Sequence, residues 1–333
     1  MDDDDRPIGR REALGTLAGV GVAVALGAIG CTDTSRTSPA SRTAAAFPLA
    51  ELRAPAQGRR VLGNTGVALP VVSLGGEGIL RTSAPNPAAV AMICAALQAG
   101  VRYCDTAPAY ADSERHYGAA FRQMSGARAG VFLASKTHLR TRVESLGLLE
   151  QSLRILGTDH LDLWQLHDLR THEDLEEIFA RGGAIEAVEQ AKRDGKIRFV
   201  GITGHADPEV LVSAMERYAF DTVLCPINPS DPRRLPFLET VVPEARRRGM
   251  GVIGMKVFAA GRLVQDGAAS VEELIRYAAG FADTLIIGCR SAEEIESNLA
   301  LGAGIAAMGG EERRALEARL APDAGLYSFY KRA

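Results

Sequence analysis

The sequence predicts an α/β protein of the (β/α)₈ barrel class, also called the TIM barrel. Two observations support this class. Eight short β-rich runs alternate with helical patterns, and the alternating part spans about 230 residues, near the ~250 typical of such a barrel. Each run is bounded by Gly, Pro or polar residues. The eight predicted strands are Val71–Gly75, Val101–Thr106, Val131–Lys136, Leu161–His167, Phe199–Thr203, Thr222–Ile227, Gly251–Val257 and Thr284–Gly288.

The segments between these runs have the periodicity of amphipathic helices. The clearest example is Thr141–Leu156, in which apolar residues recur every three or four positions. They predict one buried stripe, formed by Val143, Leu146, Leu149, Leu153 and Leu156. Parallel strands need crossover connections of about a dozen residues or more, and helices of this length supply them. The alternation therefore indicates a parallel sheet.

A β-hairpin is predicted ahead of the first barrel strand. The segment Arg59–Leu69 contains two short β-rich runs on either side of an Asn64-Thr65-Gly66 turn. We expect this hairpin to close the N-terminal end of the barrel.

A doubly wound open sheet is the alternative architecture, because it also alternates strands with helices. That fold usually carries a GxGxxG phosphate-binding turn after its first strand. Here the first strand is followed by Gly75-Gly76-Glu77-Gly78, in which the glycines have the wrong spacing. The barrel is therefore favoured, and in a barrel the residues at the C-terminal strand ends build the active site.

Residues 1–57 differ in character from the rest, and we predict three parts: 1–31, 32–57 and 58–333. Arg10 and Arg11 precede an apolar run that ends at Cys31, and a Ser/Thr/Pro/Ala stretch follows. This order is similar to a twin-arginine export signal with a lipoprotein cleavage site, followed by a flexible linker.

The N-terminal pattern predicts use of the twin-arginine export machinery, a lipid anchor at Cys31 and a periplasmic or cell-envelope location. A disordered tail on a cytoplasmic protein is the alternative. A variant with Arg10→Lys and Arg11→Lys that kept its location would refute the export route.

Composition and charge argue against several classes of function. The chain carries 38 Lys and Arg against 41 Asp and Glu, a formal net charge of −3, so no basic surface for nucleic acid is expected. The five cysteines lie far apart and form neither a CxxC motif nor a Cys/His cluster. We therefore predict no disulfide framework and no zinc or iron–sulfur site.

Four polar side chains fall at or just after the C-terminal ends of three neighbouring predicted strands. Asp105, Lys136 and His167 lie at the ends of the second, third and fourth strands, and Tyr110 lies one short loop after Asp105. Each of them alone has an ordinary structural explanation. Together on one mouth of a barrel they predict a catalytic group.

These residue types suit proton delivery to a carbonyl oxygen. A free tyrosine has a pKa near ~10, so it needs a neighbouring cation that stabilises its phenolate, and Lys136 is the candidate. Asp105 would pair with the Lys136 ammonium, and His167 would donate a hydrogen bond to the substrate oxygen. No side chain carries hydride, so we expect a nicotinamide cofactor to supply it.

As a set, these motifs resemble those of the aldo-keto reductase superfamily, in a divergent bacterial branch. The resemblance extends over nearly all of the chain from Arg60 to about Ala300. The segments that carry it are Leu62–Gly66, Asp105–Ala107, Tyr110, Ser113-Glu114, Ala134–Thr137, Leu163–His167, Ile287–Arg290 and Asn298.

The resemblance implies a barrel that binds NADP(H), with NAD(H) as the alternative. It would reduce a small aldehyde or ketone to an alcohol, or catalyse the reverse reaction. Tyr110 would be the general acid, Lys136 and Asp105 would tune it, and His167 would orient the carbonyl group.

The resemblance also indicates where the cofactor binds. The residues that stand in the corresponding places are Thr203, Asn228, Lys256, Gly288, Arg290 and Asn298. Gly288 would let the backbone approach a phosphate, Arg290 would meet the 2′-phosphate of NADP, and Asn298 would contact the adenine. No metal site is expected.

Two functions from different classes remain. The first is an NAD(P)H-dependent reductase or dehydrogenase, and the second is a nucleotide-binding sensor or scaffold barrel with little turnover. The presence of both Tyr110 and Lys136 favours the enzyme, because nucleotide binding alone needs neither.

Overall fold

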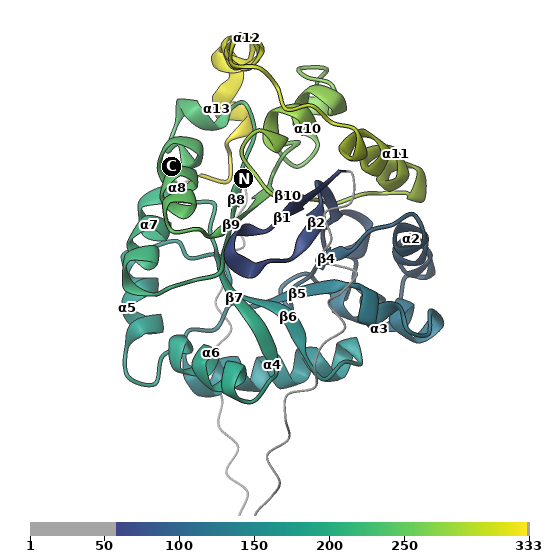
Figure 1. Ribbon diagram of the computed structural model, residues 1–333, viewed down its shortest axis with the longest axis vertical. Coiled ribbons are helices and arrows are strands. Elements are labelled where there is room, and N and C mark those ends of the chain that lie inside the picture. Colours follow the sequence, from purple (N-terminus) through teal and green to yellow (C-terminus); the bar gives the residue numbers. More distant parts are fainter. Residues whose placement is uncertain (1–57, 332–333) are drawn as a thin grey trace, which may run out of the picture. The chain divides into compact units, whose positions relative to one another are not determined.

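A computed structural model describes residues 58–331 and shows a closed barrel of parallel strands (Figure 1). The strands follow the order β10-β3-β4-β5-β6-β7-β8-β9, so each pairs with the next along the chain and the last pairs with the first. The (β/α)₈ class predicted from the sequence is confirmed, and each predicted run corresponds to one strand. The strands are β3 (Val72–Leu74), β4 (Tyr103–Asp105), β5 (Phe132–Thr137), β6 (Leu161–Leu166), β7 (Ile197–Thr203), β8 (Thr222–Pro226), β9 (Gly251–Met255) and β10 (Thr284–Ile287).

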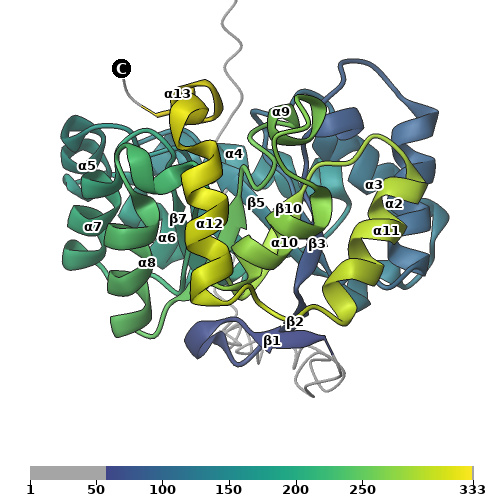
Figure 2. The ribbon, with the colours of Figure 1, turned by 90° about the horizontal axis from the view of Figure 1, so that it is seen from above.

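Helices connect the strands and cover the outside of the barrel (Figures 1 and 2). They are α2 (Pro87–Gln98), α3 (Ser113–Gln123), α4 (Arg142–Leu156), α5 (His172–Phe179), α6 (Ala184–Arg193), α7 (Pro208–Arg217), α8 (Phe237–Arg247), α9 (Arg262–Gln265), α10 (Val271–Ala279), α11 (Ala292–Ala303), α12 (Gly310–Leu320) and α13 (Ala324–Tyr327). Several of them begin after a side chain that accepts hydrogen bonds from the first turn, which satisfies backbone donors that the helix leaves free. These caps are Asn86, Thr141, Thr171, Asp207, Ser270 and Ser291.

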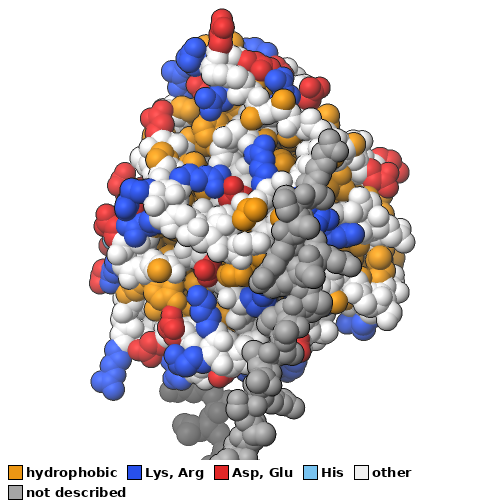
Figure 3. Space-filling view, in the orientation of Figure 1, with side chains coloured by type: hydrophobic (Ala, Val, Ile, Leu, Met, Phe, Trp, Pro, Cys, Tyr) orange, Lys and Arg blue, Asp and Glu red, His pale blue; other side chains and the backbone are white. Residues whose placement is uncertain are grey.

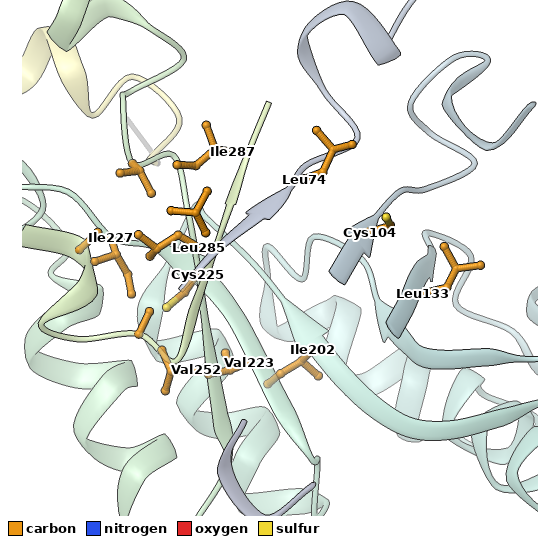
Figure 4. Close-up of a cluster of buried hydrophobic side chains, with 14 of the residues drawn as sticks. Leu74, Cys104, Leu133, Ile202, Val223, Cys225, Ile227, Val252, Leu285 and Ile287 are labelled. Atoms are coloured by element: carbon orange, nitrogen blue, oxygen red, sulfur yellow. The ribbon is translucent and has the colours of Figure 1, made fainter. Parts of the chain in front are cut away.

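The strands separate two hydrophobic clusters, because successive side chains on a strand point to opposite faces. Tyr103 and Phe132 belong to the smaller cluster, which fills the barrel interior. Cys104, Leu133 and Trp164 belong to the larger cluster, between the strands and the helices. Figure 4 shows part of this outer cluster, including Cys104 and Leu133. The interior below the C-terminal mouth is therefore packed with side chains.

The predicted N-terminal hairpin is present, and it closes one end of the barrel. Its antiparallel strands are β1 (Arg59–Val61) and β2 (Ala68–Pro70). Leu62, Val67 and Leu69 are fully buried and belong to the interior cluster. Gly63 has a φ of 48°, and a Cβ atom there would lie 2.2 Å from the Gly251 nitrogen, so only glycine fits this close approach. Figure 2 shows the hairpin at one end of the barrel and α13 at the other.

Helix α4 matches the predicted segment, but its buried face differs from the predicted stripe. Leu149, Leu153 and Leu156 are buried as expected, whereas Val143 is 75% exposed. The buried face also includes two small polar residues, Ser145 and Ser152. Since each helical residue turns by about 100°, a face that passes through these serines rotates Val143 out to the surface. Apolar spacing alone could not show this rotation.

Other expectations concern the N-terminal segments, metal sites and the charge of the surface. The predicted signal segment, the linker and the lipid-anchor site at Cys31 lie outside the described residues and stay predictions. Within residues 58–331, no helix is long and apolar enough to cross a bilayer, and no group of three or more His, Cys, Asp or Glu side chains is placed to hold a metal ion. On the face shown in Figure 3, basic and acidic side chains are interspersed.

Candidate active site

The four polar residues that the sequence singles out meet at the C-terminal mouth of the barrel. Asp105 ends β4, Lys136 lies on β5, His167 follows β6 directly, and Tyr110 lies in the loop after β4. The Lys136 Nζ is 4.6 Å from the centroid of the Tyr110 ring. The rings of Tyr110 and His167 are 5.5 Å apart and nearly perpendicular. Three neighbouring strands thus bring the four side chains together.

Lys136 and Asp105 form an ion pair in which both side chains are fully buried. The Lys136 Nζ donates to Asp105 Oδ2 at 2.5 Å and to the Thr106 carbonyl oxygen at 2.8 Å. Two residues that sequence reasoning missed complete the pair: the Tyr103 hydroxyl and the Gln165 Nε2 each donate to Asp105 Oδ1 at 3.3 Å. Tyr103 stands two positions before Asp105 on β4, and Gln165 stands two positions before His167, which directly follows β6. That spacing places them on the same face and was the available signal.

The Tyr110 phenol is protonated at neutral pH. Burial, with the negative charge of Asp105, raises the pKa of Tyr110 well above its ordinary value. The sequence led us to expect the opposite direction, with Lys136 stabilising the phenolate. Because Asp105 accepts from the Lys136 ammonium at 2.5 Å, the phenol faces a nearly neutral pair instead of a free cation. A protonated phenol is the form that a general acid requires.

His167 is neutral at physiological pH. Burial, with the positive charge of Lys136, lowers the pKa of His167 to about 2. A neutral imidazole can donate one hydrogen bond and accept another. The His167 Nδ1 is buried and has no hydrogen-bond partner among residues 58–331. Such an atom is typically satisfied by a bound ligand or an ordered water.

Replacing His167 with glutamine is expected to make the fold less sensitive to acid. The folded-state pKa of about 2 lies below the ordinary value of 6.5, so the unfolded state binds the proton first as the pH falls. This group therefore stabilises the wild-type fold above pH 6.5, and that contribution is lost progressively below it. Between about pH 7.5 and about pH 5.5 the wild type should lose about 1.4 kcal/mol more unfolding free energy than His167→Gln. Equal losses in urea titrations of the two proteins would contradict the assignment.

A second layer of polar contacts fixes the loop that carries Tyr110. The Ser135 hydroxyl donates to Glu114 Oε1 at 2.7 Å, and the Thr106 hydroxyl donates to the Ser113 hydroxyl at 2.9 Å. Glu114 is only 4% exposed. These contacts tie the first turn of α3 to β5 and to the end of β4. The short loop between β4 and α3 is therefore held at both ends.

Asp105, Tyr110 and His167 line a cleft of about 610 Å³. This volume is within the range of about 300–1,000 Å³ that small-molecule sites occupy. The other walls come from the loops after β3, β7, β9 and β10. Gly76, in the loop after β3, makes close packing possible: a Cβ atom there would lie 2.6 Å from the Asp105 carbonyl oxygen and 2.9 Å from Tyr110 Cδ2.

Most of the predicted cofactor residues also line this cleft, namely Thr203, Lys256, Gly288, Arg290 and Asn298. The Lys256 Nζ lies 3.2 Å from Glu77 Oε2, so this ion pair joins the loops after β9 and β3. Arg290 is exposed and pairs with Glu294 at 3.2 Å. Asn298 is buried, and its Nδ2 donates to the Cys289 sulfur at 3.7 Å.

Asn228 differs from its predicted role. It is fully buried and does not line the cleft. Its Nδ2 donates to the Lys256 carbonyl oxygen at 3.0 Å and to the Tyr330 hydroxyl at 2.8 Å. Its Oδ1 accepts from the Ser230 N–H at 3.0 Å. Because both amide protons bond within the protein and the side chain is fully buried, Asn228 supports the Lys256 loop and does not face the cleft.

Sequence reasoning missed several charged residues that line the cleft, namely Glu77, Arg81, Asp168 and Arg170. The Arg81 guanidinium lies 5.6 Å from the centroid of the Tyr110 ring. These residues stand in loops, where no periodicity marks which side chain points inward. Of these four residues, only Asp168 could have been predicted to line the cleft, because it directly follows His167 in the sequence.

Comparison with known protein families matches residues 71–273 to the Aldo/keto reductase family. Among curated proteins, L-galactose dehydrogenase from Arabidopsis thaliana is 28% identical over 225 residues, which cover 62% of this chain and 67% of that protein. The chain spans about half the length of several other curated relatives.

Two solved structures share the fold. An aldo-keto reductase from Bacillus halodurans in its holo form has a TM-score of 0.66 and 22% identity, covering 79% of this chain and 96% of that one. A Bombyx mori aldo-keto reductase in complex with NADP has a TM-score of 0.61 and 19% identity, covering 80% and 94%. The family match spans more than half of the chain and contains all four residues at the mouth. The chain therefore belongs to the aldo/keto reductase family.

Proposed function

We propose that this protein is an NADP(H)-dependent oxidoreductase that reduces an aldehyde or ketone to an alcohol, or catalyses the reverse reaction. One observation carries the proposal: the protonated Tyr110 phenol lies over the buried Lys136–Asp105 pair, beside neutral His167, in a cleft. Buried ion pairs have a desolvation penalty, and this pair, unlike the buried Lys331–Asp231 pair, lies against the Tyr110 ring. Family membership and the relative named L-galactose dehydrogenase support oxidation–reduction.

The side chains at the mouth have complementary roles in moving one proton. Tyr110 donates its phenol proton to the carbonyl oxygen, and the Lys136 ammonium stabilises the phenolate as it forms. Asp105 holds the ammonium in place, since its Oδ2 accepts from Nζ at 2.5 Å. His167 donates a hydrogen bond to the same carbonyl oxygen and keeps it near the phenol. In the reverse direction Tyr110 takes the proton back.

The residues of the cleft fit a phosphorylated nicotinamide cofactor, which would supply or accept the hydride when bound. At Gly288 a Cβ atom would lie 3.1 Å from neighbouring backbone, so the missing side chain keeps this wall thin. Lys256 and Arg290 are cations that can exchange their carboxylate partners for phosphate groups. Thr203 and Asn298 add polar groups to the same cleft.

Steady-state assays with NADPH and a panel of small aldehydes and ketones test the proposed function. We expect substrate-dependent loss of NADPH absorbance with at least one compound. If NADPH bound, as shown by a change in its fluorescence, but no compound caused its oxidation, the nucleotide-binding sensor would be the better description.

Replacing Arg290 with methionine should weaken the binding of NADPH more than the binding of NADH. Arg290 is exposed and its ion pair is with Glu294 one turn later, so the change should leave the fold intact. Loss of a contact to the 2′-phosphate should raise the KM for NADPH about tenfold, the size of one charge-assisted hydrogen bond. Arg193→Met, on the outer helix α6, is the matched control. Equal changes in KM for the two cofactors would refute a role in phosphate recognition.

A further inference from the structure

A second cavity lies on the outside of the barrel, away from the candidate active site. Helix α3 packs there against both α2 and α4 (Figure 1). The three helices line an open groove of about 750 Å³, a volume within the range of small-molecule sites. Among residues 58–331, none lines both this groove and the cleft at the mouth. We call it the outer groove, and its lining includes Val90, Arg115, Ala119, Arg122, Arg154 and Ile155.

The outer groove carries an excess of positive charge. Three arginines and one aspartate line it, and Arg115 pairs with the aspartate, Asp112, at 3.1 Å. Arg122 and Arg154 form no ion pair with any residue that the structure describes. A guanidinium presents its N–H donors in a planar fork that matches the oxygens of a phosphate or a carboxylate. The groove is therefore suited to an anion.

The sequence around these two arginines supplies no carboxylate to neutralise them. Neighbours on a helix face stand three and four residues apart, and no acidic residue occurs at those distances from Arg122. Glu150 stands four residues before Arg154, but its carboxylate pairs with Lys196 instead. Within the described residues, the Arg154 side chain donates only to the Glu150 carbonyl oxygen, at 3.3 Å. Both guanidinium groups therefore keep donors for a bound molecule.

The outer groove also has an apolar surface. Val90 from α2, Ala119 from α3 and Ile155 from α4 line it beside the arginines. Ala119 and Ile155 are half-buried, so part of each side chain stays accessible to a bound molecule. An apolar group that covers such surface gains about 25 cal/mol for each Å² removed from water. The groove thus combines cations with apolar side chains, and a purely ionic ligand would use only the cations.

A phosphate group suits these cations better than a carboxylate does. A phosphate monoester carries about 1.5 to 2 negative charges at pH 7, whereas a carboxylate carries a single one. The two unpaired guanidinium groups come from different helices, Arg122 from α3 and Arg154 from α4. The oxygens of a phosphate point in several directions and can accept from both, whereas the planar carboxylate is matched by one fork.

We infer that the outer groove binds a small phosphorylated molecule whose remaining part is apolar. Arg122 and Arg154 bind the phosphate group, and Val90, Ala119 and Ile155 contact the apolar part. The site is distinct from the one proposed for cofactor and substrate, because the groove and the catalytic cleft share no lining residue among residues 58–331. The inference therefore adds a second ligand site and does not depend on the proposed function.

Isothermal titration calorimetry with phenyl phosphate tests this inference. The full chain would be titrated in the presence of NADP, which keeps the catalytic cleft occupied. We expect one phenyl phosphate to bind per chain, about tenfold more tightly than inorganic phosphate, because the phenyl ring adds apolar contact. The affinity should fall as sodium chloride is added, since salt screens exposed charges.

Two kinds of variant locate the site. Arg122→Gln combined with Arg154→Gln removes both unpaired charges and should weaken the binding of phenyl phosphate about tenfold or more. The matched control is Arg193→Gln combined with Arg314→Gln, which changes the net charge equally at exposed positions on α6 and α12 and should leave the affinity unchanged. Ala91→Trp keeps every arginine but blocks the groove, because Ala91 lines it and is exposed on α2. This variant should also bind phenyl phosphate more weakly.

The titrations separate a built site from nonspecific attraction. The inference would be wrong if phenyl phosphate did not bind, or if inorganic phosphate bound as tightly, which would indicate an adventitious ion only. Binding that the double variant of Arg122 and Arg154 leaves unchanged, or that the control variant weakens equally, would also overturn it. If Ala91→Trp failed to fold, as its melting temperature would show, the two arginine variants would still decide. A protein that binds phenyl phosphate in this way but oxidises no NADPH would contradict the proposed function alone.

Discussion

Tyr110→Phe is expected to remove nearly all carbonyl reduction while the protein still folds and binds NADPH. The phenylalanine ring can keep the packing of Tyr110 against Lys136 and His167 but has no proton to give. Loss of a positioned general acid lowers kcat by about 10²- to 10⁴-fold. Single-turnover measurements of NADPH oxidation would show whether the loss is in the chemical step.

Tyr218→Phe is the matched control for this substitution. The Tyr218 hydroxyl donates to Glu189 on the outer surface of the barrel, between α7 and α6. Its removal should leave kcat at the wild-type value. Wild-type turnover in Tyr110→Phe would exclude the phenol as the proton donor and would require another acid in the cleft.

Lys136→Met is expected to have the largest effect on stability, together with loss of activity. Methionine is close to lysine in volume, so the substitution removes the charge and leaves the space filled. Asp105 would then be a buried carboxylate whose remaining donors are Tyr103 and Gln165. Breaking a buried ion pair in this way costs about 3–5 kcal/mol. Urea unfolding of the wild type and of the variant measures the difference.

Charge and packing can be separated in this pair. In Asp105→Asn with Lys136→Met both charges are absent, so most of the lost unfolding free energy should return while activity stays lost. Lowering the pH should also restore part of the unfolding free energy that Lys136→Met loses. Burial raises the pKa of Asp105 above its unfolded value, so the folded state binds the proton first. The deficit is therefore present at neutral pH and shrinks as the pH falls. If the double variant were as unstable as Lys136→Met, the loss of unfolding free energy would come from changed packing and not from the unpaired Asp105 charge.

The barrel could be predicted because each signal for it is local. Strand runs, crossover helices and the hairpin turn are properties of short segments, and only one topology joins eight such units in a closed parallel sheet. The buried face of α4 was less predictable. Ser145 and Ser152 lie on its buried face, whereas Val143, which the apolar spacing predicts to be buried, is exposed. Which residues an element buries depends on the surface that it meets.

The candidate site also has features that the sequence predicts and features that depend on distant contacts. Asp105, Lys136 and His167 stand at strand ends, and the barrel class alone implies that strand ends converge. The pairing of Asp105 with Lys136 could be predicted, whereas the burial that raises the pKa of Tyr110 could not, because burial depends on the loops that surround the phenol. Asn228 faces its own loop instead of the cleft for a comparable reason: its hydrogen-bond partners are distant in the sequence.

The β1–β2 hairpin closes the end of the barrel that lies opposite the candidate active site. Its apolar side chains Leu62, Val67 and Leu69 belong to the same buried cluster as the packed interior of the barrel. In the proposed reaction each reduction would consume the proton of Tyr110, and the replacement would come from solvent. Because side chains fill the interior, that proton would enter through the same mouth by which the alcohol leaves, so product departure and reprotonation of Tyr110 would share one route.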